Sequence, residues 1–287
     1  KDVYAFWRDG RLDTESNALF GEGGAGAFSD GKLTTQIKER QNRCAKVLRE
    51  LVAAGAPEEI LYLAKPHIGT DNLIPVVENL RRRIIDAGGE VRFSTRVDEI
   101  CIENKAISGV RFQDGSYFPT RQVVLAIGHS ARDTMDALHA AGVPMLPKAF
   151  SIGVRVEHPQ RQLDRTQSGR YAGHHRLGAA EYKLVHHCSN GRSVYSFCMC
   201  PGGEVIATSS EAGQVVTNGM SRYARKAPNA NSGLLVGVNP EDFGEGHPLA
   251  GIAFQRQWER LAFELGGGDY RAPVQRFEDF LAKRPST

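Results

Sequence analysis

The sequence predicts an α/β fold whose second half is an antiparallel, β-rich α+β domain inserted into the first. Apolar residues from Leu73 to Ile85 recur at helical spacing. The run 123–127 is apolar without alternation, which is typical of a strand buried on both faces of a parallel sheet. From Phe150 onward, short alternating segments dominate. We therefore expect one domain over residues 1–150, to which 276–287 return, and an inserted domain over 151–275.

The first half begins with helices. Apolar residues at positions 3–7 already have helical spacing, so the chain starts inside an amphipathic pattern. A second apolar stripe predicts a helix over 42–54, and Gly55 is a natural stop. The stripe that follows Asp71 predicts a longer helix, which ends at Gly88 and Gly89.

Strands are expected next. Alternation over 91–97, continued to Ile102, predicts a strand with one buried face. Asp114-Gly115 predicts a hairpin between 109–112 and 117–118. After the predicted buried strand 123–127, Ser130 is placed to cap a helix. A strand end and a helix N-terminus would then meet in a crevice of the kind that binds ligands in α/β sheets.

The second half is predicted to be mainly strands. Phe150 to Val156 alternate, and Asn190-Gly191 predicts a hairpin that joins 182–187 to 193–199. Further short strands are expected at 205–208, 215–217 and 234–238. A helical pattern follows over 249–265 and stops at three glycines.

Composition limits the class of protein. The chain has 287 residues, 41% of them hydrophobic, which is enough for one large or two smaller cores. Its net charge of +3 is spread along the sequence, so we expect no nucleic-acid partner. Five cysteines without framework spacing favour reduced thiols, and no apolar run approaches the roughly twenty residues of a membrane span. We expect a cytoplasmic protein that acts on a small molecule and has no membrane partner; nothing indicates its oligomeric state.

Five glycines lie between Gly21 and Gly31. Glycine reaches positive φ at little cost and lets the backbone approach a ligand closely. Gly21, Gly23 and Gly26 match G-x-G-x-x-G, but neither the strand before it nor the helix after it is present, so we reject the dinucleotide fingerprint here. Two interpretations remain: a turn whose successive amides bind an anion or a ring, and a mobile surface loop.

The glycine-rich segment closely resembles the signature of a family of largely uncharacterised FAD-dependent dehydrogenases, which are relatives of the glutathione-reductase-type flavoproteins. The matching stretches cover nearly the whole chain and are Gly21–Lys32, Ala64–Asp71, Leu125–Asp133, Gly153–Pro159, Tyr195–Gly203 and Val216–Ser221. The resemblance implies an incomplete FAD-binding Rossmann-like domain with an inserted substrate domain. It also implies that this chain is a fragment without the N-terminal G-x-G-x-x-G crossover and without a C-terminal segment.

The resemblance implies FAD as the cofactor and assigns its contacts by motif position. The glycine-rich segment would lie at the flavin end, Val97 near the adenine, and the run 126–129 near the pyrophosphate or ribose. The residues implied are Gly23, Gly24, Ala25, Gly26, Phe28, Ser29, Lys32, Val97, Ala126, Gly128 and His129. NAD(P)H would fit as an electron donor, although the chain carries no second dinucleotide fingerprint.

The catalytic residues are not evident from the sequence. Lys32 could offer positive charge to a reduced flavin, or it could be an ordinary exposed lysine. Cys198 and Cys200 could be redox thiols, core residues or, less readily, metal ligands, because their spacing lacks the C-x-x-C form. The function expected is that of an FAD-dependent oxidoreductase with a small-molecule substrate. The alternative is a non-catalytic flavin-binding or regulatory protein that retains the fold.

Overall fold

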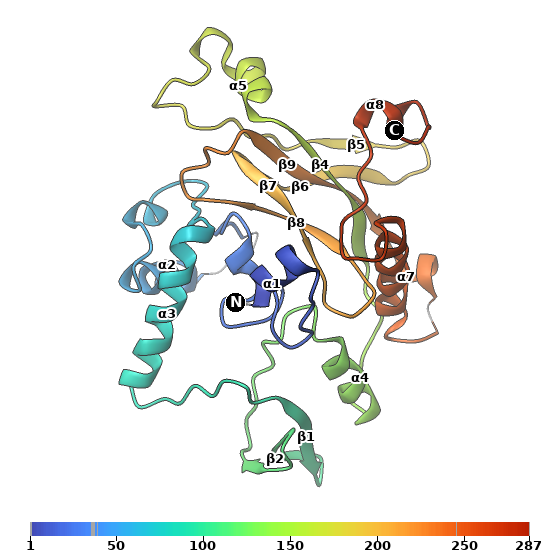
Figure 1. Ribbon diagram of the computed structural model, residues 1–287. Coiled ribbons are helices and arrows are strands. Elements are labelled where there is room, and N and C mark those ends of the chain that lie inside the picture. Colours follow the sequence, from blue (N-terminus) through green and yellow to red (C-terminus); the bar gives the residue numbers. More distant parts are fainter. Residues whose placement is uncertain (1, 36–37, 39, 245, 287) are drawn as a thin grey trace.

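The computed structural model describes residues 2–35, 38, 40–244 and 246–286. Helices and antiparallel sheets alternate along the chain (Figure 1). The α-helices are α1 (Asp2–Asp9), α2 (Arg43–Ala53), α3 (Thr70–Asp86), α4 (Arg132–Ala140), α5 (Gln160–Ser168), α6 (Pro240–Phe243), α7 (Ala250–Leu265) and α8 (Phe277–Leu281). Three 3₁₀ turns are η1 (Gly24–Phe28), η2 (Glu58–Leu61) and η3 (Gly169–Tyr171). None of the helices within the described residues is both long and apolar enough to cross a membrane.

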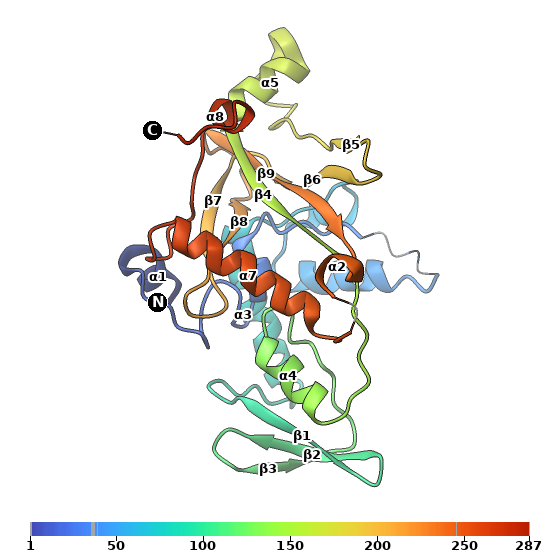
Figure 2. The same cartoon turned by 90° about the vertical axis from the view of Figure 1, so that its right-hand side faces the viewer.

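The strands form separate sheets, and every strand pair in the described ranges is antiparallel. They are β1 (Val97–Glu103), β2 (Ala106–Phe112), β3 (Tyr117–Pro119), β4 (Phe150–Pro159), β5 (Val185–His187), β6 (Ser193–Cys200), β7 (Gly203–Thr208), β8 (Val216–Ser221) and β9 (Asn229–Val238). The first sheet has the order β1-β2-β3, the second β4-β9-β6-β5, and the third pairs β7 with β8. Figures 1 and 2 both place β1–β3 at one end of the molecule and the larger sheet at the other, with α4 between them.

Two apolar clusters support these elements. Ile60, Ile68 and Val76 are almost completely buried where α2, η2 and α3 pack together. In the second cluster, Phe150 of β4 packs against Phe243 of α6 and Phe254 of α7. Its ring centroid lies 5.3 Å from that of Phe243 and 6.3 Å from that of Phe254. Figure 2 shows α7 running across the molecule beside the end of this sheet. The stripes that predicted α2, α3 and α7 from the sequence are thus confirmed.

The buried parallel strand predicted over 123–127 is wrong. Residues 122–127 belong to no helix or sheet, and Val124 is 90% exposed. A strand of a parallel sheet needs neighbouring strands for its backbone groups, and none of the described residues lies beside this segment as a partner. An apolar run alone does not provide that pairing.

Two local predictions also need correction. The strand begins at Val97 rather than Val91, because residues 90–96 turn before they pair, with Ser94 at φ 51°. Ser130 does not cap α4; the N-cap is Ala131, and the Ser130 hydroxyl lies 3.2 Å from Nε2 of His129 instead. The hairpins at Asp114-Gly115 and Asn190-Gly191 are confirmed by the pairing of β2 with β3 and of β5 with β6.

Candidate functional site

A cavity of about 600 Å³ opens between the N-terminal segment, the end of the exposed run 122–127 and the loop that follows β7. This volume lies within the range of small-molecule sites. The cavity is lined by Thr14, Glu15, Leu19, Phe20, Gly21, Gly24, Arg96, Ala126, Ile127, Gly128, His129, Ser130, Ala131, Arg132, Asp133, Thr134, Ser210, Glu211 and Ala212. Segments that are about a hundred residues apart in the sequence therefore share one space.

Three glycines border this cavity with positive φ. The angles are 120° at Gly21, 55° at Gly24 and 67° at Gly128. A Cβ atom built at any of these positions would meet no atom within 4 Å, so the backbone faces open space there. Positive φ explains why the sequence has glycine at these positions, and the open space allows a bound molecule to approach the main chain.

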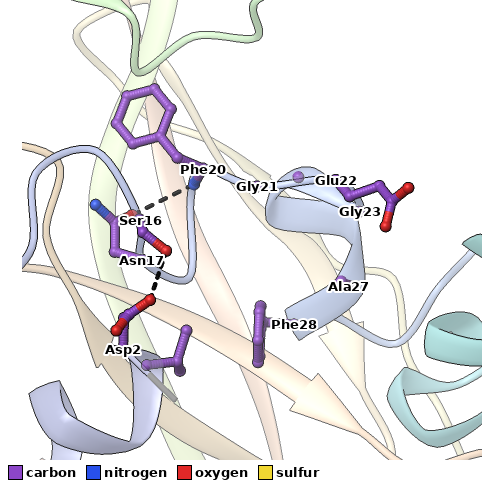
Figure 3. A pocket seen from close by; sticks show the side chains of 11 residues that line it. Asp2, Ser16, Asn17, Phe20, Gly21, Glu22, Gly23, Ala27 and Phe28 are labelled. Atoms are coloured by element: carbon purple, nitrogen blue, oxygen red, sulfur yellow. Dashed lines mark hydrogen bonds between the residues drawn. The ribbon is translucent and has the colours of Figure 1, made fainter. Parts of the chain in front are cut away.

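The glycine-rich segment separates this cavity from a smaller hollow of about 140 Å³. Phe20, Gly21 and Gly24 border both spaces. Figure 3 shows Asp2 and Asn17 on one side of the hollow and Phe28 on the other. On the first side, the Ser16 hydroxyl donates to Asp2 at 2.9 Å, and the Phe20 amide donates to the Asn17 side chain at 3.3 Å. These bonds hold the entry to the glycine-rich segment in place.

Arg132 forms the charged floor of the larger cavity. Its side chain is only 3% exposed. Its guanidinium donates to Glu259 of α7 at 2.6 and 2.9 Å and to Glu211 after β7 at 2.6 Å. Gln214 and Gln255 accept weaker bonds at 3.1 and 3.3 Å. Burial opposes the charge of Arg132, but its hydrogen bonds to both carboxylates and their negative charges outweigh burial, and the pKa of Arg132 is raised.

The remaining nitrogen of this guanidinium has no partner. Nε of Arg132 is one of three buried side-chain nitrogen or oxygen atoms in the described part of the chain that make no hydrogen bond. An unsatisfied buried donor is costly, and such atoms in native structures call for an explanation such as a bound ligand. The pKa of nearby Glu211 would be raised by burial, but hydrogen bonds from Arg256 and Arg132 lower it to about 2.

His129 lies on the wall of the cavity as a neutral imidazole. Burial and, to a smaller extent, the charge of Arg132 lower its pKa below the usual 6.5, while Glu259 opposes the shift. An imidazole with such a pKa is largely uncharged at pH 7 and can donate one hydrogen bond and accept another. The hydroxyl of Ser130 is 3.2 Å from its Nε2.

The candidate residues from the sequence, including the two cysteines, lie in different parts of the structure. Gly24, Ala126, Gly128 and His129 line the larger cavity, whereas Gly23 and Phe28 line the smaller hollow. Ala25 and Gly26 lie within η1, and the Ser29 hydroxyl donates to the Gly26 carbonyl at 2.8 Å. Val97 opens β1 and pairs with Phe112, while its neighbour Arg96 lines the cavity. Lys32, Cys198 and Cys200 lie outside both spaces.

Sequence reasoning did not identify Arg96, Arg132 or Glu211 as site residues. The partners of Arg132 are 79 and 127 positions away, so no local pattern reveals the cluster. The only available signal was the arginine directly after Gly128-His129-Ser130-Ala131, at the beginning of a predicted helix.

The lining suits a nucleotide cofactor with a ring system. Leu19 and Phe20 provide apolar surface. The charges of Arg96 and Arg132 are already balanced by paired carboxylates. The three open glycines and the unpartnered Nε of Arg132 leave backbone and guanidinium groups available to a ligand. The residues present therefore fit FAD. No group of three or more His, Cys, Asp or Glu side chains in the described ranges is arranged to hold a metal ion.

Comparison with known proteins connects the chain to flavoproteins. Residues 149–287 match the family model described as "FAD-dependent protein, C-terminal domain-like". An uncharacterized protein of Clostridium beijerinckii (strain ATCC 51743 / NCIMB 8052) is 52% identical over 286 residues, which cover 99% of this chain and 53% of that protein. The chain thus spans about half the length of the curated relative it matches. The family match supports an FAD-dependent family and, with it, FAD binding.

Proposed function

We propose that this chain is part of an FAD-dependent oxidoreductase and that the larger cavity belongs to its flavin-nucleotide site. The observation that carries the proposal is the meeting of the glycine-rich segment with Gly128 and His129 around one space of about 600 Å³. The match of residues 149–287 to an FAD-dependent family supports the choice of cofactor.

The chain's own residues would contribute binding and orientation. The backbone at Gly21, Gly24 and Gly128 would lie against the cofactor, with Leu19 and Phe20 beside its apolar part. The unpartnered Nε of Arg132 would donate a hydrogen bond to the cofactor. FAD, when bound, would supply the electron or hydride transfer. A neutral His129 could donate a hydrogen bond without adding charge, and burial of the cavity floor would exclude water.

We also propose the division of labour between the two halves. Residues 1–150, with 276–287, would provide most of the FAD site, to which the loop 210–212 adds one edge. The rest of 151–275 would hold a small-molecule substrate.

Titration of FAD into the protein, followed by flavin fluorescence, tests the site. Gly128→Val and Gly24→Val should each raise the dissociation constant at least tenfold, because the new side chain enters the space that the cofactor needs. Gly115→Val is the matched control: Gly115 also has positive φ and no atom within 4 Å, but it lies in the β2–β3 turn away from the cavity. If all three substitutions change the dissociation constant equally, the cavity is not the FAD site.

Chemistry is tested separately by anaerobic reduction. We expect a donor such as NADH or NADPH to bleach the flavin absorbance of the FAD-loaded protein. Flavin that is retained but reduced by no donor in a broad panel would assign the chain a binding or regulatory role instead.

A further inference from the structure

A second cluster of reactive groups lies between the glycine-rich segment and β6, outside both spaces described above. Near its end, β6 contains a bulge: Phe197 pairs with Gly233 and Cys200 with Asn231, so Cys198 and Met199 face the single residue Ser232. Cys198 has φ 46°, which is uncommon for a residue with a side chain. Strained backbone of this kind is often found at functional sites.

The bulge brings two thiols together. Cys200 is fully buried, and its Sγ lies 3.3 Å from the carbonyl oxygen of Cys198. Cys198 is partly exposed and Cys200 is buried, so Cys198 is the more accessible residue of the two. On a straight strand, residues i and i+2 are about 6.7 Å apart, near the upper limit for a disulfide. The turn at Cys198 departs from that straight geometry.

Two positive side chains, Lys32 and Arg155, act on Cys198. The Lys32 ammonium donates to the carbonyl of Met199, the residue between the two cysteines. The same ammonium lies 3.5 Å from Asp30, a carboxylate that also accepts bonds from Arg225 at 3.0 Å and from Ser221 at 2.7 Å. Arg155 of β4, which donates to Asn231 at 2.7 Å, is a second positive charge that acts on Cys198.

These groups change the acidity of the thiols in opposite directions. The pKa of Cys198 is lowered to about 6, mainly by the hydrogen bond from Cys200 and also by the charges of Lys32 and Arg155. Burial and the charge of Asp30 act in the opposite direction. The hydrogen bond to Cys198 and burial raise the pKa of Cys200. At neutral pH, Cys198 is therefore the thiolate and Cys200 keeps its proton.

We propose that Cys198 and Cys200 form a thiol–disulfide exchange site, in which Cys198 attacks small disulfides and Cys200 resolves the product. The second thiol beside the attacking sulfur favours exchange over acyl transfer. Cysteine-dependent acyl transfer uses a histidine base, and no histidine is among the groups found to act on Cys198 in the described structure. The reaction needs no flavin, so it is independent of the function proposed above.

The exchange balances as follows. The Cys198 thiolate attacks one sulfur of a disulfide R–S–S–R, which forms a Cys198–S–S–R bond and releases RS⁻. Conversion of Cys198 to the mixed disulfide removes the thiolate, and the hydrogen bond to that thiolate is the main cause of the raised pKa of Cys200. Cys200 then gives its proton to RS⁻ and attacks the Cys198 sulfur, which forms the Cys198–Cys200 disulfide and expels the second RS⁻. That thiolate takes up the proton that Cys198 had released to solvent. The pair loses two electrons and the substrate gains them; an external dithiol reduces the pair again.

Alkylation of the unmodified protein provides the first test. Iodoacetamide labelling is followed from pH 5 to 9 by mass spectrometry of the tryptic peptide 193–222, with fragmentation to separate the two cysteines. Cys188 lies in its own tryptic peptide, 184–192, and serves as the internal control. The rate at Cys198 should level off above an inflection near the pKa of about 6. At pH 6 it should exceed that of N-acetylcysteine roughly tenfold, after allowance for the lower nucleophilicity of a more acidic thiol. An inflection at pH 8 or above would overturn the proposal.

Exchange itself is tested with bis(2-hydroxyethyl) disulfide. The wild-type peptide should lose a pair of hydrogen atoms by forming the internal disulfide. Cys200→Ser should instead accumulate a mixed disulfide at Cys198, and Cys198→Ser should form neither product. A mixed disulfide that persists in the wild type, or unchanged reaction at Cys200 in Cys198→Ser, would refute the assigned roles.

The pH dependence of Cys198 alkylation also tests the role of Lys32. Lys32→Met should move the inflection of Cys198 alkylation to higher pH, because a positive charge beside the thiolate is lost. Lys46→Met removes the same charge from the exposed face of α2, where Lys46 pairs with Glu50, and should leave the inflection unchanged. An identical profile for Lys32→Met and the wild type would show that Lys32 does not support the thiolate.

Discussion

Replacing Arg132 by methionine removes the positive charge from the cluster that joins α4, α7 and the loop after β7. Both main partners of Arg132 are carboxylates, and the Glu259 side chain is only 13% exposed. Breaking a buried ion pair from one side costs about 3–5 kcal/mol, because the remaining charge loses its compensation. We therefore expect Arg132→Met to lower the free energy of unfolding by about 3–5 kcal/mol. With a urea m-value of about 3 kcal/mol/M, the midpoint should fall by roughly 1–2 M.

Urea denaturation at pH 7 and 25 °C, followed by far-ultraviolet circular dichroism, measures this loss. Arg111→Met provides the comparison: Arg111 and Glu99 form a pair on β1 and β2 in which both side chains are about half exposed, and its loss should cost less than about 1 kcal/mol. Adding Glu259→Gln to Arg132→Met should recover part of the loss, because an uncompensated carboxylate is removed as well. Equal small effects at Arg132 and Arg111 would refute the view that this cluster holds the cavity floor together.

Two further outcomes test other parts of the structure. Because the folded pKa of Glu211, about 2, lies below the ordinary value of 4.5, the unfolded chain takes up a proton first as the pH falls. The free energy of unfolding should decline between about pH 5 and pH 2, and this slope should be shallower in Glu211→Gln; an unchanged slope would contradict the assignment. Gly69→Ala should lower the melting temperature strongly, because φ is 79° and the new Cβ would lie 2.2 Å from the Tyr223 backbone nitrogen. Gly115 has a similar φ but open space around its Cβ position. If Gly115→Ala lowers the melting temperature as much as Gly69→Ala does, the close contact with Tyr223 is not the cause.

Much of the secondary structure could be predicted because its signals are local. The apolar stripes of α3 and α7 and the two hairpin dipeptides each act within about seventeen residues of chain. The strand predicted over 123–127 was wrong for the opposite reason, because a strand is defined by partner strands that lie elsewhere in the sequence. Its apolar composition says that the segment can be buried, not that a partner strand lies beside it.

The candidate site shows the same difference between local signals and contacts formed only on folding. The glycines that border the cavity could be predicted from the sequence, because the positive φ at Gly24 and Gly128 favours glycine at these positions. Arg132 was missed because its role depends on Glu259 and Glu211, which only folding brings to it. The acidity of Cys198 was hidden as well, because the bulge that turns its thiol toward Cys200 and Lys32 leaves no mark in the order of residues.

The buried carboxylate of Asp30 has a practical consequence for dissecting this protein. Asp30 has no exposed surface, and its bonds from Ser221 and Arg225 come from the far side of residue 150. A cut between the two predicted domains would leave this charge without those partners and would open the adjoining core to solvent. Separately expressed halves should therefore be poor stand-ins for the intact chain, whereas co-expressed halves could reassemble around Asp30.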